Sequence, residues 1–102
     1  MTPGEQLEQY TLKCPQEVLI VTAQIGTEPD EVMIFRGFSS SLMRPTSPDP
    51  DVPVLPPDAV IETIDRLQAP YRPDQPQYLA QGISWPEFQP LLAAVGLGRM
   101  DL

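Results

Sequence analysis

The hydrophobic pattern of residues 17–38 predicts a β-hairpin at the centre of the fold. Residues 17–25 form the most apolar stretch, and most of their side chains are β-branched, which favours a strand. Both sets of alternate positions in this stretch are largely apolar, so we expect a central strand that is covered on both faces. Residues 26–30 contain residues typical of turns, and residues 31–38 resume the strand pattern after this five-residue loop.

Three other segments show a strand pattern. Residues 7–12 alternate in polarity and contain Tyr and Thr, so we expect a short strand there. Residues 59–67 fit either a strand or a helix capped by Asp58. Their β-branched side chains and the following Pro70 favour the strand. Residues 78–83 fit a short final strand.

The clearest local signal is a helix start at residues 84–87. The segment Ser-Trp-Pro-Glu is a capping box, in which the serine oxygen accepts from a helical N–H and the glutamate reaches back. Apolar side chains then recur on one helical face as far as Val95, and Gly96 is a natural stop. We therefore expect an amphipathic C-terminal helix that Pro90 bends near its start.

Proline divides the chain into short elements. The sequence has 14 prolines among 102 residues, and six of them lie between Pro45 and Pro57. Prolines at this density cannot pair regularly in a sheet, because they lack the N–H that a ladder needs. Val52 and Leu55 within this loop are apolar, so we expect residues 45–58 to lie against the body of the domain.

The elements predict a mainly β (α+β) domain. It would contain about five short antiparallel strands, forming a small curled sheet or barrel, and one C-terminal amphipathic helix. We expect a flexible N-terminus over residues 1–6, a single globular domain over residues 7–96 that includes the proline-rich loop, and a flexible C-terminus over residues 97–102. The pattern does not distinguish a closed barrel from an open sheet.

Composition excludes several kinds of site. Six Lys and Arg stand against 14 Asp and Glu, and the resulting net charge of −8 argues against nucleic-acid binding. The chain has no histidine and one cysteine, Cys14, so it lacks the Ser-His-Asp triad, an internal disulfide and a structural zinc site. The aspartates of the proline-rich loop do not follow the order of an EF-hand. We therefore expect a non-enzymatic domain with no catalytic residue, metal or cofactor.

The sequence also predicts a cytoplasmic protein. Its longest apolar run, residues 18–23, is far too short to cross a membrane. The first residues lack the basic start and the apolar stretch of a signal peptide. A single unpaired cysteine fits a reducing compartment.

The best candidate for a binding segment runs from Phe35 to Pro45. It holds two aromatic residues, three serines and two of the five arginines of the chain. The arginines could receive a carboxylate or a phosphate, with serine hydroxyls assisting, or they could pair with acids of the chain itself. Tyr71 and Arg72 lie in the next proline-rich connection. The predicted partner- or anion-binding residues are Arg36, Ser39, Ser40, Ser41, Arg44, Tyr71 and Arg72.

Three stretches resemble a small uncharacterised family of cyanobacteria and plant chloroplasts. They are Phe-Arg-Gly-Phe-Ser-Ser-Ser-Leu-Met-Arg-Pro-Thr (35–46), Asp-Pro-Asp-Val-Pro-Val-Leu-Pro (49–56) and Ile-Asp-Arg-Leu-x-Ala-Pro-Tyr (64–71). The resemblance covers most of residues 7–92. It implies a photosynthetic setting, in the cyanobacterial cytosol or at the thylakoid surface, and carries no activity, catalytic residue or binding residue.

From these features we expect a protein-interaction domain, which would act as an accessory, assembly or regulatory factor of a larger complex. The resemblance implies that this complex is photosynthetic and allows peripheral association with the thylakoid. The alternative is a small-molecule or anion-binding regulatory module that uses the segment Arg36–Arg44. A homodimer, formed through an exposed strand edge or the helix face, is compatible with either.

Overall fold

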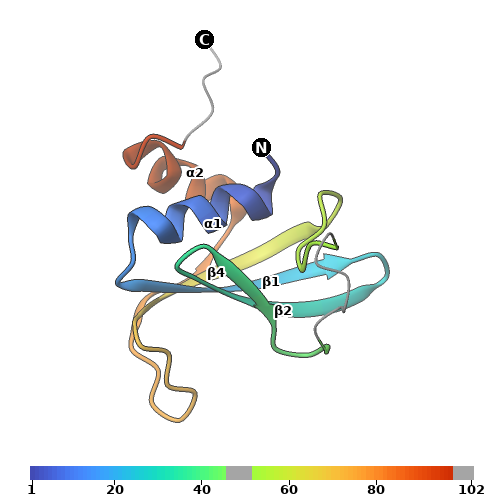
Figure 1. Ribbon diagram of the computed structural model, residues 1–102, viewed down its shortest axis with the longest axis horizontal. Helices are drawn as coiled ribbons and strands as arrows, with labels where there is room; N and C mark the ends of the chain where they lie inside the picture. The colour runs from blue at the N-terminus through green and yellow to red at the C-terminus, as the bar shows by residue number, and fades with distance from the viewer. Residues whose placement is uncertain (46–51, 98–102) are drawn as a thin grey trace.

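The computed structural model describes residues 1–45 and 52–97 as five strands and two helices (Figure 1). The elements are α1 (Pro3–Lys13), β1 (Glu17–Ile25), β2 (Glu28–Phe35), β3 (Phe38–Ser41), β4 (Val60–Gln68), β5 (Tyr78–Ile83) and α2 (Trp85–Ala94). The strands form one open antiparallel sheet in the order β3-β2-β1-β4-β5. The expected mainly β (α+β) class, with its curled sheet and C-terminal helix, is confirmed.

Strand β1 lies at the centre of the sheet, between β2 and β4. The pair Ile25 and Glu28 closes the first hairpin, which leaves a two-residue turn at Gly26–Thr27. The expected five-residue loop over residues 26–30 is therefore wrong. A tight turn needs a residue that tolerates a positive φ, and Gly26 supplies it with a φ of 64°.

The segment of residues 7–12 is helical, so the strand expected there is wrong. Helix α1 begins at Pro3, inside the segment expected to be a flexible N-terminus. Thr2 caps the helix, and its backbone N–H donates to the side chain of Glu5, which completes a capping box. The buried residues Leu7, Tyr10 and Thr11 follow the spacing of one helical face, and this spacing overrides the alternation.

The fifth strand of the sheet is instead a short edge strand, β3, which the sequence pattern did not predict. The sequence pattern ends the second hairpin strand at Phe38, with serines terminating it. In the structure Phe38–Ser41 instead turns back and pairs with β2. The predicted strands over residues 59–67 and 78–83 are confirmed as β4 and β5, and α2 starts at the predicted Ser84 capping box.

Part of the proline-rich loop lies against the body of the domain. Leu55 is buried against the first turn of α1, as expected, whereas Val52 is exposed. The close approach depends on Gly4, because a Cβ atom there would lie 3.1 Å from the carbonyl oxygen of Leu55. The rest of the expected loop, residues 46–51, and most of the C-terminus expected to be flexible, residues 98–102, lie outside the described residues.

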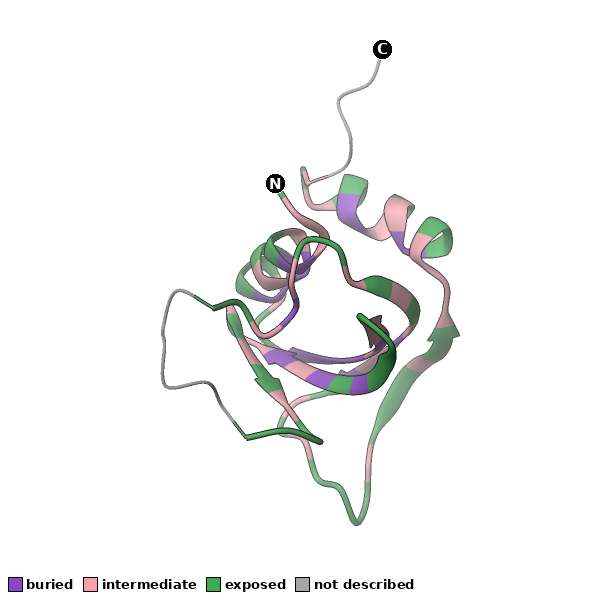
Figure 2. Ribbon diagram, turned by 90° about the vertical axis from the view of Figure 1, so that its right-hand side faces the viewer, coloured by how far each residue is buried: buried purple, intermediate pink, exposed green. Residues whose placement is uncertain are grey.

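Both helices lie on the same side of the curled sheet (Figures 1 and 2). The main core forms between them and this side, with Leu19, Val21 and Ile34 from the sheet and Leu7 and Phe88 from the helices. The rings of Tyr10 and Phe88 pack edge to face, with centroids 5.0 Å apart, and join the two helices. β1 is buried on both faces as expected, but helices cover only one of them, and side chains and a loop cover Val18 and Ile20 on the other.

A buried polar network closes one end of the core. The Tyr10 hydroxyl donates to Glu17 Oε1 at 2.9 Å, and the Arg66 guanidinium donates to both carboxylate oxygens at 2.9 and 3.0 Å. Burial, together with the hydrogen bond to Glu17, raises the pKa of Tyr10 far above its usual value. The hydrogen bond to Glu17 likewise raises the pKa of Arg66. The network therefore keeps a neutral phenol and an ion pair under the end of α1.

The network predicts a loss of stability at alkaline pH. The pKa of Tyr10 is higher in the folded chain than in the unfolded chain, where it is about 10. Its contribution to the free energy of unfolding is complete below that value and falls by about 1.4 kcal/mol per pH unit above it. Urea unfolding of the wild type and of Tyr10→Phe at about pH 8, 10 and 11 tests this. The stability difference between the two proteins should shrink as the pH rises, and a constant difference contradicts the assignment.

Candidate functional site

The sheet face opposite the helices is the candidate site, and we call it the helix-free face. Its buried residues are Val18, Ile20 and Leu67, and residues from β2 and from the loop after β4 pack on them. Tyr71 belongs to that loop, which extends away from the helices (Figure 1). No helix within residues 1–45 and 52–97 lies on this face. The face is thus apolar at its centre but covered only by side chains and one loop.

A row of apolar side chains runs across this face from one sheet edge to the other. Phe38 pairs with Phe35, Val18 pairs with Leu67, and Leu67 pairs with Tyr78. The side chains of paired residues in an antiparallel sheet lie on the same face. Phe35 also packs on the buried cluster that contains Val18, so these residues form a continuous row. The two ends of the row are the most exposed, with Phe38 78% exposed and Tyr78 48% exposed.

The turn beside Phe38 holds an arginine in an unfavourable backbone conformation. Arg36 and Gly37 have φ values of 48° and 85°, and two positive values in succession are typical of a type I′ hairpin turn. Asn-Gly is the usual sequence of such a turn, because a bulky side chain at positive φ is strained. The Arg36 guanidinium makes a cation–π contact with Phe35, and its central carbon lies 5.0 Å from the centroid of the ring. Backbone strain of this kind often occurs at functional sites, so the turn is a reason to consider this face as a site.

The helix-free face is bordered by cations that form no salt bridge with the described residues. Arg36 is exposed, and its Nε donates to the carbonyl oxygen of Pro15 at 3.5 Å. Arg72 follows Tyr71 in the loop that packs on this face. Arg44 and Arg66, by contrast, are salt-bridged to acids of the chain. Arg36 and Arg72 therefore border this face without a salt bridge to a described residue, and Asp65, whose partner Ile20 is buried on the face, adds an acid to it.

The structure divides the predicted site between the two faces of the sheet. Ser39 donates to Glu8 Oε2 of α1 at 2.7 Å, and Ser41 donates to Asp30 at 2.9 Å, both on the helix side. Ser40 pairs with Met33, which packs on the helix-free face. Of the predicted residues, Arg36, Ser40, Tyr71 and Arg72 therefore belong to or border the helix-free face, and Ser39, Ser41 and Arg44 do not. Alternation along β3 requires this separation.

Arg44 forms a salt bridge with Asp30 and therefore has a structural role. Its guanidinium lies 2.6 Å from the carboxylate of Asp30, a side chain that is 1% exposed, and it also donates to the carbonyl oxygen of Val54 at 3.3 Å. The backbone N–H of Arg44 donates to the hydroxyl of Ser41 at 2.8 Å. Arg44 thus joins the end of β3 to the described end of the proline-rich loop. This agrees with the second reading of the arginines, in which they pair with acids of the chain itself.

Phe38 is the main residue of the site that the sequence did not single out as a contact. Its spacing from Phe35 gave a signal, because a two-residue turn at Arg36–Gly37 brings the two rings opposite each other. The interpretation of residues 31–38 as one unbroken strand leaves no turn between Phe35 and Phe38, so it does not predict that the two residues pair. Residue Phe38 was then expected to end a strand rather than to begin an edge strand.

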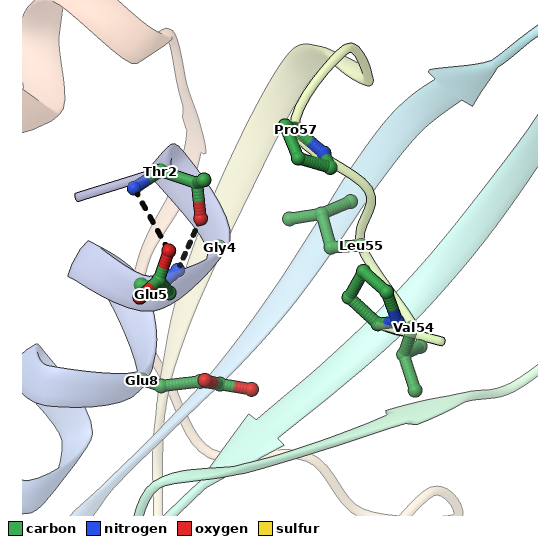
Figure 3. A pocket seen from close by; sticks show the side chains of 8 residues that line it. Thr2, Gly4, Glu5, Glu8, Val54, Leu55 and Pro57 are labelled. Atoms are coloured by element: carbon green, nitrogen blue, oxygen red, sulfur yellow. Dashed lines mark hydrogen bonds between the residues drawn. The ribbon is translucent and has the colours of Figure 1, made fainter. Parts of the chain in front are cut away.

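A pocket of about 330 Å³ lies on the other side of the molecule, between the first turns of α1 and the described end of the proline-rich loop (Figure 3). Its two carboxylates already have partners. Glu5 accepts from the backbone N–H of Thr2, which lowers its pKa, and Glu8 accepts from Ser39. The remaining wall is largely apolar and includes Leu55. The pocket therefore reflects the packing of the loop on α1.

The described residues also lack two other kinds of site. No group of three Cys, Asp or Glu side chains in the described part of the chain could hold a metal ion. No helix among residues 1–45 and 52–97 is long and apolar enough to cross a membrane.

Comparison with known proteins identifies a family whose function is unknown. A family model described as a domain of unknown function (DUF7734) matches residues 4–92. No curated protein and no solved structure matches the chain.

The buried pair of Asp30 and Arg44 predicts a stability defect. Arg44→Gln leaves the Asp30 carboxylate buried without its cation, and we expect a loss of about 1–2 kcal/mol, below the figure for a fully buried pair because Arg44 is 44% exposed. Arg72→Gln removes the same charge from an exposed position and should change stability by less than about 0.5 kcal/mol. Urea unfolding of both variants measures the contrast, and equal effects would refute the structural role of Arg44.

The backbone conformation of Arg36 predicts a second contrast. Arg36→Asn and Arg36→Ala both remove the guanidinium, but only Asn is well suited to a positive φ. We therefore expect Arg36→Asn to be more stable than Arg36→Ala by about 0.5–1 kcal/mol. Thermal unfolding of the two variants under one condition measures the difference. Identical melting temperatures would mean that the turn is relaxed.

Proposed function

We propose that this chain, which belongs to the DUF7734 family of domains of unknown function, is a non-enzymatic protein-interaction domain. It would act as an accessory, assembly or regulatory factor of a larger complex. The docking surface would be the helix-free face. The observation that carries the proposal is the exposure of Phe38, at the end of an apolar row, beside a strained arginine.

Energetic arguments support a docking role for Phe38. Burying a large aromatic side chain at an interface contributes strongly to affinity, and such residues are enriched among those that dominate binding. Phe38 has no such burial in the isolated chain, in which it is one of the most exposed apolar side chains. The apolar row behind it offers a continuous surface for a partner to cover.

The charges indicate what the partner must present. Arg36 and Arg72 lie beside the apolar surface, and neither forms a salt bridge with the described residues. A partner with apolar side chains flanked by carboxylates would match this arrangement. Such a contact would weaken as salt screens the charged rim, while the apolar centre would persist.

The alternative of an anion-binding module receives less support from the geometry. It needs the segment Arg36–Arg44 to present its arginines and serines together. Ser39, Ser41 and Arg44 instead form hydrogen bonds within the chain and lie on the helix side of the sheet. The photosynthetic setting and the cytosolic or thylakoid-surface location rest on the family resemblance and remain part of the proposal.

Affinity purification from the source organism tests the docking role. The wild-type chain should recover one defined complex, and Phe38→Ser should lower that recovery at least about tenfold, because Phe38 supplies the apolar anchor. Leu79→Ser is the matched control, since Leu79 is also an exposed apolar residue of an edge strand. Mass spectrometry at low and moderate salt quantifies the partners.

Equal recovery by the wild type and Phe38→Ser would exclude the helix-free face as the docking surface. Equal loss in Phe38→Ser and Leu79→Ser would point to unfolding or to nonspecific adhesion. The melting temperatures of both variants, measured beforehand, separate those two outcomes.

A further inference from the structure

The first half of β4 has a strand partner on one side only. Residues Val60, Ile61 and Thr63 pair with β1, whereas the pairing of β4 with β5 is confined to Ile64 and the residues after it. After Ile83 the chain leaves the sheet and enters α2. No second strand of the described chain borders residues 60–63. Since alternate residues of a ladder direct their N–H and C=O groups away from the partner strand, this edge is a template for another strand.

An apolar pocket of about 310 Å³ adjoins this open edge. The starts of α1, β4 and α2 form its walls, with lining residues Pro3, Ala59, Val60, Ile61 and Trp85. Val60 is 61% exposed, so the pocket opens to the solvent beside the strand. Its volume is at the small end of the range for ligand sites, about 300–1,000 Å³. It suits one bulky apolar side chain better than a cofactor.

The surroundings of the pocket are acidic. Four exposed acids, Glu5, Asp58, Glu62 and Glu87, each lie within two positions of a lining residue. No Lys or Arg occurs within two positions of any lining residue. A strand that adds here would therefore be favoured by positive charge next to its apolar anchor.

We propose that the open edge of β4 binds an extended basic peptide of a partner protein by strand addition. The peptide backbone would pair with residues 60–63, and a bulky apolar side chain would enter the pocket against Trp85. An open edge combined with an adjacent side-chain pocket is the arrangement that gives strand-addition sites both affinity and specificity.

A second copy of this chain fits the edge poorly. Pairing two copies here would bring two Glu62 carboxylates together, within two chains of net charge −8 each. The edge lies on the β5 side of the sheet, away from β3 and Phe38, so the inference goes beyond the proposed function.

The test begins with the full-length chain and a displayed library of short random peptides. The selected peptides should carry a bulky apolar residue with Lys or Arg at alternate positions. The best of them is then synthesised and titrated, with Trp85 as the reporter, because it is the only tryptophan of the chain and lines the pocket. The tryptophan emission should shift on binding, and the backbone amides of residues 60–63 should gain protection from hydrogen exchange.

Two charge-matched variants make the test specific. Val60→Lys blocks the pocket and adds a like charge, so the peptide should bind at least about tenfold more weakly. Met43→Lys adds the same charge just after β3, at the opposite edge of the sheet, and should leave the affinity within about twofold. Both positions are exposed, and unchanged melting temperatures would show that both variants are folded.

Any of five results would overturn the inference. Two are the selection of acidic peptides and the selection of no peptide at all. Two more are equal weakening by the two variants and binding without protection of residues 60–63. The last is a wild-type dimer that Val60→Lys dissociates, because a second copy would then occupy the edge. None of these results bears on the helix-free face, since Phe38 tests that surface separately.

Discussion

The structure depends on one constraint, which is that both faces of the central strand β1 are apolar. The described residues form two short helices, and both pack on the same face, where Tyr10 and Phe88 join them. Burial of the other face is left to neighbouring side chains and to the loop that carries Tyr71. Because side-chain cover decreases toward the sheet edge, Phe38 remains in solvent. The exposed apolar surface is thus a consequence of how little chain is available to cover β1.

The same one-sided arrangement explains the roles of the polar residues. On the helix side, Glu17 and Asp30 are buried, Ser39 and Ser41 are half-buried, and each forms hydrogen bonds within the chain. An enclosed charge without a partner would strongly destabilise the fold, so Arg66 and Arg44 are committed to these acids. The exposed arginines Arg36 and Arg72 border the face that no helix of the described residues covers.

Much of the fold could be predicted from the sequence, because its signals are local. The β-branched run of β1 and the Ser84 capping box of α2 each specify their own structure. The strand expected over residues 7–12 is wrong because six residues are too few to distinguish a strand from a helix by the spacing of apolar positions. The helical spacing is clear only over all eleven residues of α1. The candidate site was only half predicted. Adjacent serines in the sequence lie on opposite sides of a strand, and which side meets a helix is decided by tertiary packing.

The central claim is that the helix-free face, rather than the helix side, is the docking surface. Hydrogen exchange of the chain, alone and within the complex that it recovers, tests this claim most directly. The account predicts that protection on binding is concentrated in residues 33–42 and in residues 69–78, which comprise the loop after β4 and the start of β5. Protection confined to α1 and α2, with the exchange of those two segments unchanged, would contradict it.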